Sequence, residues 1–160
     1  MNAFDVLKYG DLTLQRTIEG LPEADWVVGG VCGWWSVKDI VAHLTSFEHV
    51  LVEVLTSFLG GGPTPTLDQY IRLNGDQFNE VQVSQRQDKT PAEALAEYRD
   101  RQACTMTLVA QILPETLRQP GTLPWYGMEY SLDDFITYAY YGHKREHSAQ
   151  IAVFCDQIKR

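Results

Sequence analysis

Two histidines near the C-terminal end of the chain have a spacing that allows both side chains to bind one metal ion. His143 and His147 stand four residues apart in the stretch His-Lys-Arg-Glu-His. In a helix, both imidazoles then leave the same face one turn apart, about 40° from each other around the axis. Gln150 lies about 20° from the direction of His143 on the same face. We therefore expect a chelating pair, with Gln150 as a catalytic or orienting group beside it.

The residues around this pair predict that its face points into the core. Buried imidazoles need partners for their nitrogens, and a divalent cation satisfies several nitrogens at once. His43, on the flank of another apolar stripe, is expected to supply a third nitrogen. Three histidines would leave coordination positions open, as in catalytic zinc sites, and nickel, manganese and iron also accept imidazole. The apolar neighbours at helical spacing are Phe135, Ile136, Ala139, Ile151 and Phe154.

A hydrogen-bonded core explains an isolated histidine pair equally well, so it is the third histidine that favours a metal. His49 is six residues, or about 240°, beyond His43 and is expected to point elsewhere. Asp39, one turn before His43, either orients that ring or completes a capping box with Ser36. Capping is the favoured interpretation.

Two acidic residues are further candidates. Glu146 is a predicted catalytic residue, as a general base or a fourth ligand, although a charge beside Lys144 and Arg145 is more typical of a solvated face. Asp11 falls in the apolar series of the first helix and has the same ambiguity. Neither acid is needed for the predicted three-histidine site.

Long helices are required to bring these distant histidines together. Three Gly- and Pro-rich patches, at 29–33, 60–65 and 114–127, read as loops. Capping boxes are predicted at Ser36, Thr90 and Ser131, each with an acid three residues later. The first helix is expected to bury Phe4, Leu7, Leu14 and Ile18. The expected helices span 4–18, 36–59, 67–85, 90–113 and 131–158, of which 67–85 and 90–113 form one block broken near Asp88.

These blocks predict an all-α fold, a four-helix bundle forming a single domain over residues 1–160. Apolar residues make up 44% and charged residues 21% of the 160, which is the balance of an ordinary globular domain. Alternating apolar and polar residues are scarce. We expect at most a short strand pairing at one end of the bundle, around 33–35 or 123–126.

Charge and cysteine usage exclude several classes of function. A net charge of -8 with few, scattered basic residues argues against a nucleic-acid partner or an anionic membrane surface. No apolar run is long enough to span a bilayer, and the N-terminal residues do not resemble a signal peptide. Three cysteines without metal-binding spacing predict neither a disulfide framework nor a zinc knuckle. We expect a cytoplasmic protein with reduced thiols and a small-molecule substrate.

Two stretches carry a resemblance to a known family. Residues 34–44 (WWSVKDIVAHL) and 142–151 (GHKREHSAQI) resemble the DinB/YfiT-like superfamily of metalloenzymes. The resemblance implies a four-helix bundle, commonly a homodimer, in which one histidine of the second helix and two of the last bind a divalent metal. The matching positions are His43, His143 and His147.

The same resemblance implies an activity. Characterised branches include transferases and isomerases that use bacillithiol, mycothiol or glutathione, and another branch protects against reactive toxins. We therefore expect metal-dependent transfer of a low-molecular-weight thiol to an electrophilic small molecule, in stress or detoxification. A thiol bound to a cation is deprotonated and becomes a nucleophile. Cys155 lies about 80° around the helix from His147 and two turns further on, so the nucleophile is expected from outside.

Three alternatives stay open on sequence alone. The first is hydrolysis by a metal-activated water, assisted by Glu146 or Gln150. The second is a bundle that sequesters a ligand without catalysis. The third is a purely structural bundle without metal. A sequestered ligand would lie against aromatic residues at the loop ends, namely Trp34, Trp35, Tyr70, Trp125 and Tyr126.

Overall fold

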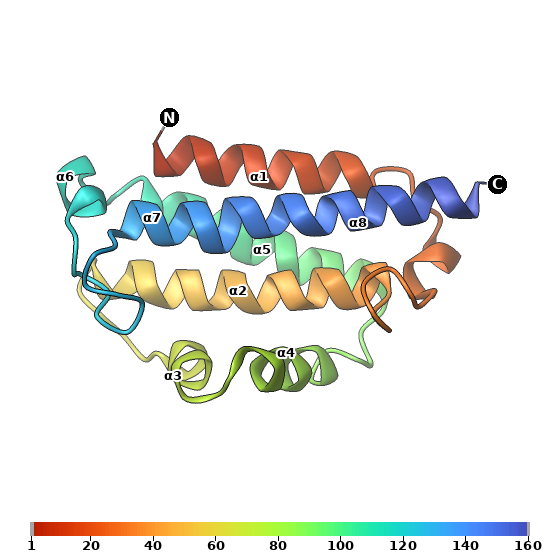
Figure 1. Ribbon diagram of the computed structural model, residues 1–160, viewed down its shortest axis with the longest axis horizontal. Coiled ribbons are helices and arrows are strands. Elements are labelled where there is room, and N and C mark those ends of the chain that lie inside the picture. Colours follow the sequence, from red (N-terminus) through yellow and green to blue (C-terminus); the bar gives the residue numbers. More distant parts are fainter. Residues whose placement is uncertain (1, 160) are drawn as a thin grey trace.

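The computed structural model describes residues 2–159 and is built almost entirely from helices (Figure 1). Met1 and Arg160, the two ends of the predicted domain, lie outside the described residues. The last long helix is continuous from α7 through a π-helical segment, η2, into α8. The elements are α1 (Ala3–Ile18), η1 (Glu23–Val27), α2 (Val37–Ser57), α3 (Pro65–Arg72), α4 (Gly75–Ser84), α5 (Pro91–Val109), α6 (Pro114–Arg118), α7 (Leu132–Ile136), η2 (Thr137–Gly142) and α8 (His143–Ile158).

Four long helical rods form the bundle, which confirms the predicted fold class. Figure 1 shows α2 and α5 running in one direction and α1 and the α7–α8 rod running in the other. Because α2 and α5 are parallel, the chain must cross back between them, and α3 and α4 make this crossover while packing on α2. No helix in the described part of the chain is long and apolar enough to cross a membrane.

The predicted capping boxes fix where three helices begin. The hydroxyl and backbone N–H of Ser36 donate to Asp39 Oδ2, and the Asp39 N–H donates back to Ser36 Oγ at 3.2 Å. Each box satisfies backbone donors that a helix start leaves free. Asp39 is committed to this cap, so capping, and not support of His43, is its observed role. The other two boxes are Thr90 with Glu93 and Ser131 with Asp134.

The helix predicted over 67–85 is wrong in its middle. The chain leaves the helical conformation at Leu73 and begins α4 after Asn74, whose side-chain oxygen accepts from the Gln77 N–H at 2.8 Å. Asparagine competes for backbone hydrogen bonds and favours a helix start, and a glycine follows it directly. The 114–127 patch is also more ordered than expected, because Pro114 opens the short helix α6.

A tight turn precedes α2 and holds Trp35 in place. The Val31 N–H donates to the Trp35 carbonyl at 2.9 Å, and the Trp35 N–H donates to the Cys32 carbonyl at 3.0 Å. Gly33 has φ of 59°, a left-handed conformation that glycine adopts without strain. The Cys32–Trp35 pair is the only β-bridge among residues 2–159. The expected short pairing is therefore a single bridge.

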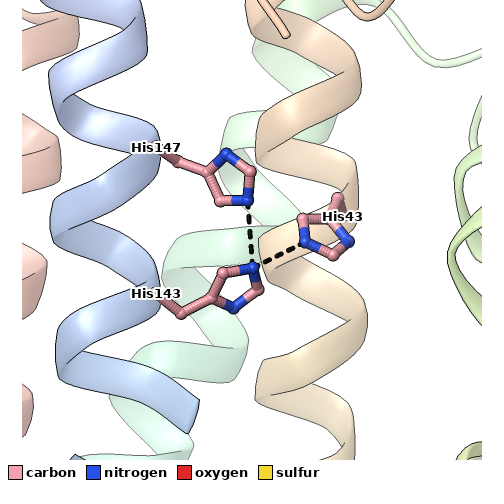
Figure 2. A group of neighbouring side chains, drawn as sticks. All are labelled: His43, His143 and His147. Atoms are coloured by element: carbon pink, nitrogen blue, oxygen red, sulfur yellow. Dashed lines mark hydrogen bonds between the residues drawn. The ribbon is translucent and has the colours of Figure 1, made fainter. Parts of the chain in front are cut away.

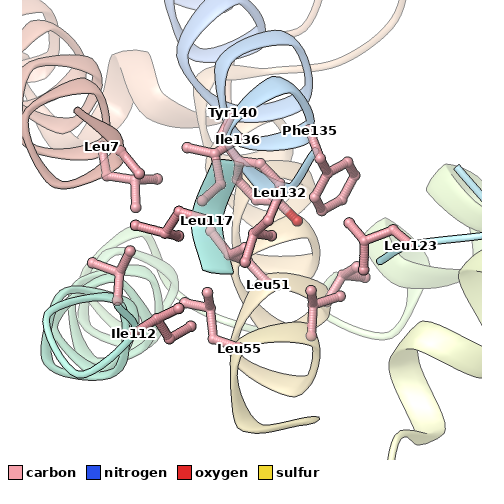
Figure 3. Packing of buried hydrophobic residues seen from close by; sticks show 14 of the residues in the cluster. Leu7, Leu51, Leu55, Ile112, Leu117, Leu123, Leu132, Phe135, Ile136 and Tyr140 are labelled. Carbon is pink, nitrogen blue, oxygen red and sulfur yellow. The ribbon is translucent and has the colours of Figure 1, made fainter. Parts of the chain in front are cut away.

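The bundle core consists of two apolar clusters, one toward each end. One cluster contains the start of α1 and the ends of α2 and α5, together with α7 (Figure 3). The other contains the end of α1, the starts of α2 and α5 and the end of α8. Between them, every long helix contributes polar side chains. One expectation fails here, since Phe4 is 40% exposed and outside both clusters. The polar residues of this middle layer are Asp11, His43, Glu48, Thr105, His143, Lys144 and His147.

Candidate metal centre

Three histidine side chains from two helices converge in this middle layer (Figure 2). His43 comes from α2, and His143 and His147 come from one face of α8. His143 Nε2 lies 2.8 Å from His43 Nε2 and 3.0 Å from His147 Nε2. One ring nitrogen from each histidine lies within 4.8 Å of the other two. The sequence prediction that these residues come together agrees with this geometry.

The second nitrogens of His147 and His143 face outward, each toward an oxygen. His147 Nδ1 donates to Gln150 Oε1 at 2.8 Å, one turn along α8. The backbone carbonyl of Ala139 accepts a hydrogen bond from His143 and raises the pKa of that ring. These acceptors place the hydrogens of both rings on the outer nitrogens, which leaves lone pairs on the inner ones. Gln150 therefore orients a candidate ligand, as its spacing suggested.

His43 is held less tightly than its two neighbours. The Asn79 side chain, from α4, raises the pKa of His43, yet His43 Nδ1 and Asn79 Oδ1 are both buried without a partner of full hydrogen-bonding geometry. Sequence reasoning missed Asn79, because nothing in the local pattern of α4 marks it as a neighbour of a histidine in another helix.

The environment keeps these imidazoles neutral. Burial is the largest cause that lowers the pKa of His43 to about 2 and of His143 to about 4, and the neighbouring imidazoles lower both further. Burial also lowers the pKa of His147, opposed by the hydrogen bond to Gln150 and by the charge of Glu146. At neutral pH, each ring therefore carries no charge and a single N–H hydrogen.

A divalent cation fits this arrangement. The inner nitrogens of His143 and His147 both carry lone pairs and lie 3.0 Å apart, so neither can satisfy the other by donating a hydrogen. Neutral imidazoles are preferred ligands of zinc, nickel, copper and iron. The three histidines are the residues that would hold the ion, and their donor set leaves further coordination positions for a substrate.

Aromatic rings wall the histidines from two sides. The ring centroid of Trp35 lies 4.8 Å from that of His43, and Phe47 lies 5.1 Å from His43 and 4.7 Å from His143. Tyr70 and Phe78 pack on Phe47 from the crossover helices. This wall excludes water from most of the site, so access must come from the openings at its edges.

Two surface hollows reach the edges of the site. The first, of about 530 Å³, is lined by His143, Phe47, Tyr70 and Glu146 among others. The second, of about 420 Å³, lies beside Trp35 and Asn79. Its lining residues are Cys32, Gly33, Trp34, Trp35, Asp76, Asn79 and Glu80.

The acidic candidates lie outside the ligand cluster. Glu146 is exposed at the rim of the hollow beside His143, and its carboxylate is not among the clustered donors found in residues 2–159. A role as fourth ligand is therefore not supported, whereas a role at the mouth of the site fits its position. Asp11 accepts a hydrogen bond from the Tyr98 hydroxyl at 2.8 Å and is likewise outside the cluster.

The remaining predicted residues are His49, the cysteines and the aromatic residues at the loop ends. His49 points away from the site and pairs with Glu97 at 3.0 Å. The described cysteines are free thiols, and burial raises the pKa of the Cys155 thiol, which disfavours the thiolate. Among the proposed aromatic contacts, Trp125 and Tyr126 pack on Phe135 in the apolar cluster and do not line either hollow.

Sequence reasoning also missed a buried ion pair beside the histidines. The charges at 144–146 were interpreted together as typical of a solvated face, but Lys144 is 2% exposed and pairs with Glu48, which is fully buried. A signal was present, because Glu48 falls in the same helical stripe as Leu44 and Leu51. The expectation is wrong because a long charged side chain can be buried when an opposite charge meets it inside the core.

Comparison with known proteins gives one match. A family model described as the DinB superfamily matches residues 11–151, a span that includes all three histidines. No curated protein and no solved structure matches the chain.

Proposed function

The chain belongs to the DinB superfamily, and from this membership and its three converging histidines we propose that it is a metal-dependent enzyme. The proposed reaction transfers a low-molecular-weight thiol to an electrophilic small molecule. The proposed metal ligands are His43, His143 and His147. Glu146 is the proposed proton acceptor and Gln150 the group that orients His147.

One observation carries the metal proposal: the inner nitrogens of His143 and His147 lie 3.0 Å apart while the Gln150 and Ala139 oxygens take the hydrogens of the two rings. Adjacent lone pairs in a buried site are unfavourable unless a positive charge lies with them. A hydrogen-bonded structural cluster would need a donor facing an acceptor, and the His143–His147 contact does not provide one while both outer nitrogens carry the hydrogens.

The residues of this chain divide the work of the reaction. A cation held by three imidazoles would lower the pKa of a thiol that reaches it. The Glu146 carboxylate, on the rim beside His143, accepts the thiol proton and releases it to solvent. The sulfur then forms a bond to the electrophilic carbon, and the leaving group departs with the electron pair of the broken bond. Phe47 and Trp35 keep bulk water away from the histidines.

The nucleophile is proposed to come from outside the chain. No cysteine belongs to the donor cluster found among residues 2–159. Cys155 has a raised thiol pKa, and Cys32 lines the second hollow and not the one beside His143. A free thiol such as bacillithiol, mycothiol or glutathione would enter through the hollow beside His143.

Metal content tests the first half of the proposal. Purified untagged protein should contain, or take up, one divalent ion per chain, measured by elemental analysis. His43→Ala and His143→Ala should each lose it, because the two residues lie on different helices of the same site. His49→Ala is the matched control, since His49 is also on α2 but pairs with Glu97, and it should keep the ion. A protein that binds no divalent ion tightly would overturn the proposal.

Turnover with defined reactants tests the second half. With monochlorobimane as electrophile, each thiol is added in turn and formation of the fluorescent thioether is followed with the loaded protein. His147→Ala should abolish the metal-dependent rate. Metal-dependent hydrolysis of ester substrates without any thiol would instead favour the activated-water alternative, since Glu146 could equally take a proton from water. Stoichiometric binding without product would favour sequestration.

A further inference from the structure

An ion pair crosses between the two metal-binding helices beside the histidines. Lys144 Nζ, on α8, lies 2.5 Å from Glu48 Oε1, on α2. The side chains are 3% and 0% exposed. Neither of these two atoms has another hydrogen-bonding partner among residues 2–159, so each charge is compensated by the other.

The surroundings of the pair connect it to the remaining two long helices. The Thr105 hydroxyl, on α5, donates to the second Glu48 oxygen at 2.8 Å. The Lys144 ammonium lies 5.3 Å from the ring centroid of Tyr98, also on α5, and the Tyr98 hydroxyl donates to Asp11 on α1. Each of the four long helices therefore contributes to this contact network.

This network lies next to the three histidines in both the sequence and the fold. Lys144 directly follows His143 in the chain, and Glu48 lies about one and a half turns beyond His43 on α2. The network and the histidines share the polar layer between the two apolar clusters. The same two helices therefore meet through both features.

Apolar packing alone defines the axial position of one helix on another only loosely. Cores accept hydrophobic side chains of about the right size and lose a unique arrangement before they lose stability. A buried ion pair is different, because sliding one helix would separate two charges that have no water to replace the partner. A three-histidine site needs its ligands placed within about 0.5 Å, which apolar contacts do not ensure.

We infer that the Glu48–Lys144 pair is a positioning device that sets the register of α8 on α2, and thereby brings His143 and His147 to His43. This inference rests on the proposed metal function for its consequence, but the register itself is a property of the protein without metal. Glu48 and Lys144 touch no reacting atom and act only through the histidines.

The decisive variant replaces both charges by apolar groups of similar length, Glu48→Met with Lys144→Met. A volume-conserving apolar pair leaves stability equal or higher, so the thermal midpoint should not fall. The dissociation constant for Co²⁺, followed by its visible spectrum in the protein, should rise roughly ten- to a hundredfold, with altered band positions. An unchanged dissociation constant and spectrum would overturn the inference.

A second variant covers the case in which the double variant does not fold. Thr105→Val removes the hydroxyl that fixes Glu48 without touching α2 or α8, and it should weaken Co²⁺ binding a few-fold. Thr107→Val is the matched control on the same helix, since that hydroxyl bonds only to the Ala103 carbonyl. Equal Co²⁺ affinity in the Thr105 and Thr107 variants would count against the inference.

A metal-free measurement separates this inference from the proposed function. In the parent protein, proton NMR should show cross-relaxation between the His43 ring and the rings of His143 and His147, whose centroids lie 4.7 and 5.1 Å away. These signals should weaken in the double variant. A parent protein that binds no Co²⁺ would sink the metal proposal, while the NMR comparison would still decide the role of the ion pair.

Discussion

Residues 143 and 144 are neighbours in the chain, yet their side chains enter two opposite kinds of polar environment. His143 meets two other imidazoles, whose inner nitrogens lie 2.8 and 3.0 Å from its own. Lys144 meets a carboxylate of opposite charge, and a threonine hydroxyl bonds to the other oxygen of that carboxylate. Both clusters cross between α2 and α8. The ion pair is complete, because its two charges compensate each other, whereas the histidine cluster still lacks a positive charge between its inner nitrogens.

The difference indicates which polar cluster positions the two helices and which is built to bind. Natural proteins satisfy buried polar groups almost everywhere, so a buried set of facing lone pairs requires an explanation. The Glu48–Lys144 ion pair requires no such explanation, because each charge already has a partner of opposite sign. The contrast predicts that removing one charge of the pair alone costs stability, and that changes at 143 act mainly on metal affinity.

The largest expected effect is that of breaking the complete cluster. Lys144→Met should lower the free energy of unfolding by about 3–5 kcal/mol, because it leaves the Glu48 carboxylate buried without a counter-charge. Urea unfolding followed by circular dichroism measures this loss. Lys8→Met, on the exposed side of α1, is the control and should change the value by less than about 0.5 kcal/mol. Equal effects of the two substitutions would contradict the claim that Lys144 compensates a buried charge.

The next effect is that of filling the incomplete cluster. A divalent ion at about 100 times its dissociation constant should raise the free energy of unfolding of the parent by about 2.7 kcal/mol, because only the folded state holds the three ligands together. In His143→Ala, the same ion concentration should leave the unfolding curve where it was. Stabilisation of that variant to the parental extent would show that the ion binds elsewhere.

The pH dependence of the metal-free protein sharpens the contrast further. In the unfolded chain, imidazoles bind protons below about pH 6.5, whereas burial keeps the pKa of folded His43 at about 2 and of folded His143 at about 4. Unfolding therefore takes up protons, and stability present above about pH 6.5 is lost as the pH falls toward 5. Each histidine contributes a slope of up to about 1.4 kcal/mol per pH unit.

His143→Leu should make this slope shallower, which urea unfolding at several pH values would reveal. Glu97, whose pKa is lowered to about 2 by its partners in spite of burial, contributes only below the usual range of a glutamate. The window between about pH 5 and 6.5 therefore reports on the histidines. An equal slope in parent and variant would mean that His143 stays protonated when folded.

The smallest predicted effect concerns the orienting amide. Gln150→Leu removes the oxygen that accepts from His147 Nδ1, and metal affinity should fall roughly tenfold, or about 1.4 kcal/mol. Gln157→Leu, on the exposed side of α8, should leave the affinity unchanged in the same titration. Stability without metal should stay close to that of the parent in both variants, in contrast to Lys144→Met.

Local sequence patterns predicted the parts of this molecule that depend on local physics. The i,i+4 spacing put His143 and His147 on one face, and the serine and threonine caps fixed the starts of α2, α5 and α7. These features depend on contacts within a few residues. The third histidine could be added because its own stripe showed that His43 lies near the core.

What the patterns missed depends on distant partners. Lys144 is buried because Glu48, almost a hundred positions earlier, meets it, and charged residues are normally expected outside. Asn79 reaches His43 only because the crossover folds back over α2. The interruption at Asn74 had a local signal, a cap residue before glycine, which the apolar periodicity outweighed.

The π-helical segment Thr137–Gly142 has a consequence for how this chain tolerates changes in length. A π-type turn accommodates one more residue than an α-turn without changing the facing of the helix on either side. Loss of one exposed residue there, such as Tyr138, lets the rod wind regularly with His143 and His147 still directed at α2. Loss of Arg145 instead turns His147 by about 100° around the helix axis, from about 40° on one side of His143 to about 60° on the other. A deletion of one residue is therefore tolerated in the π-helical segment just before the histidines, but not between His143 and His147.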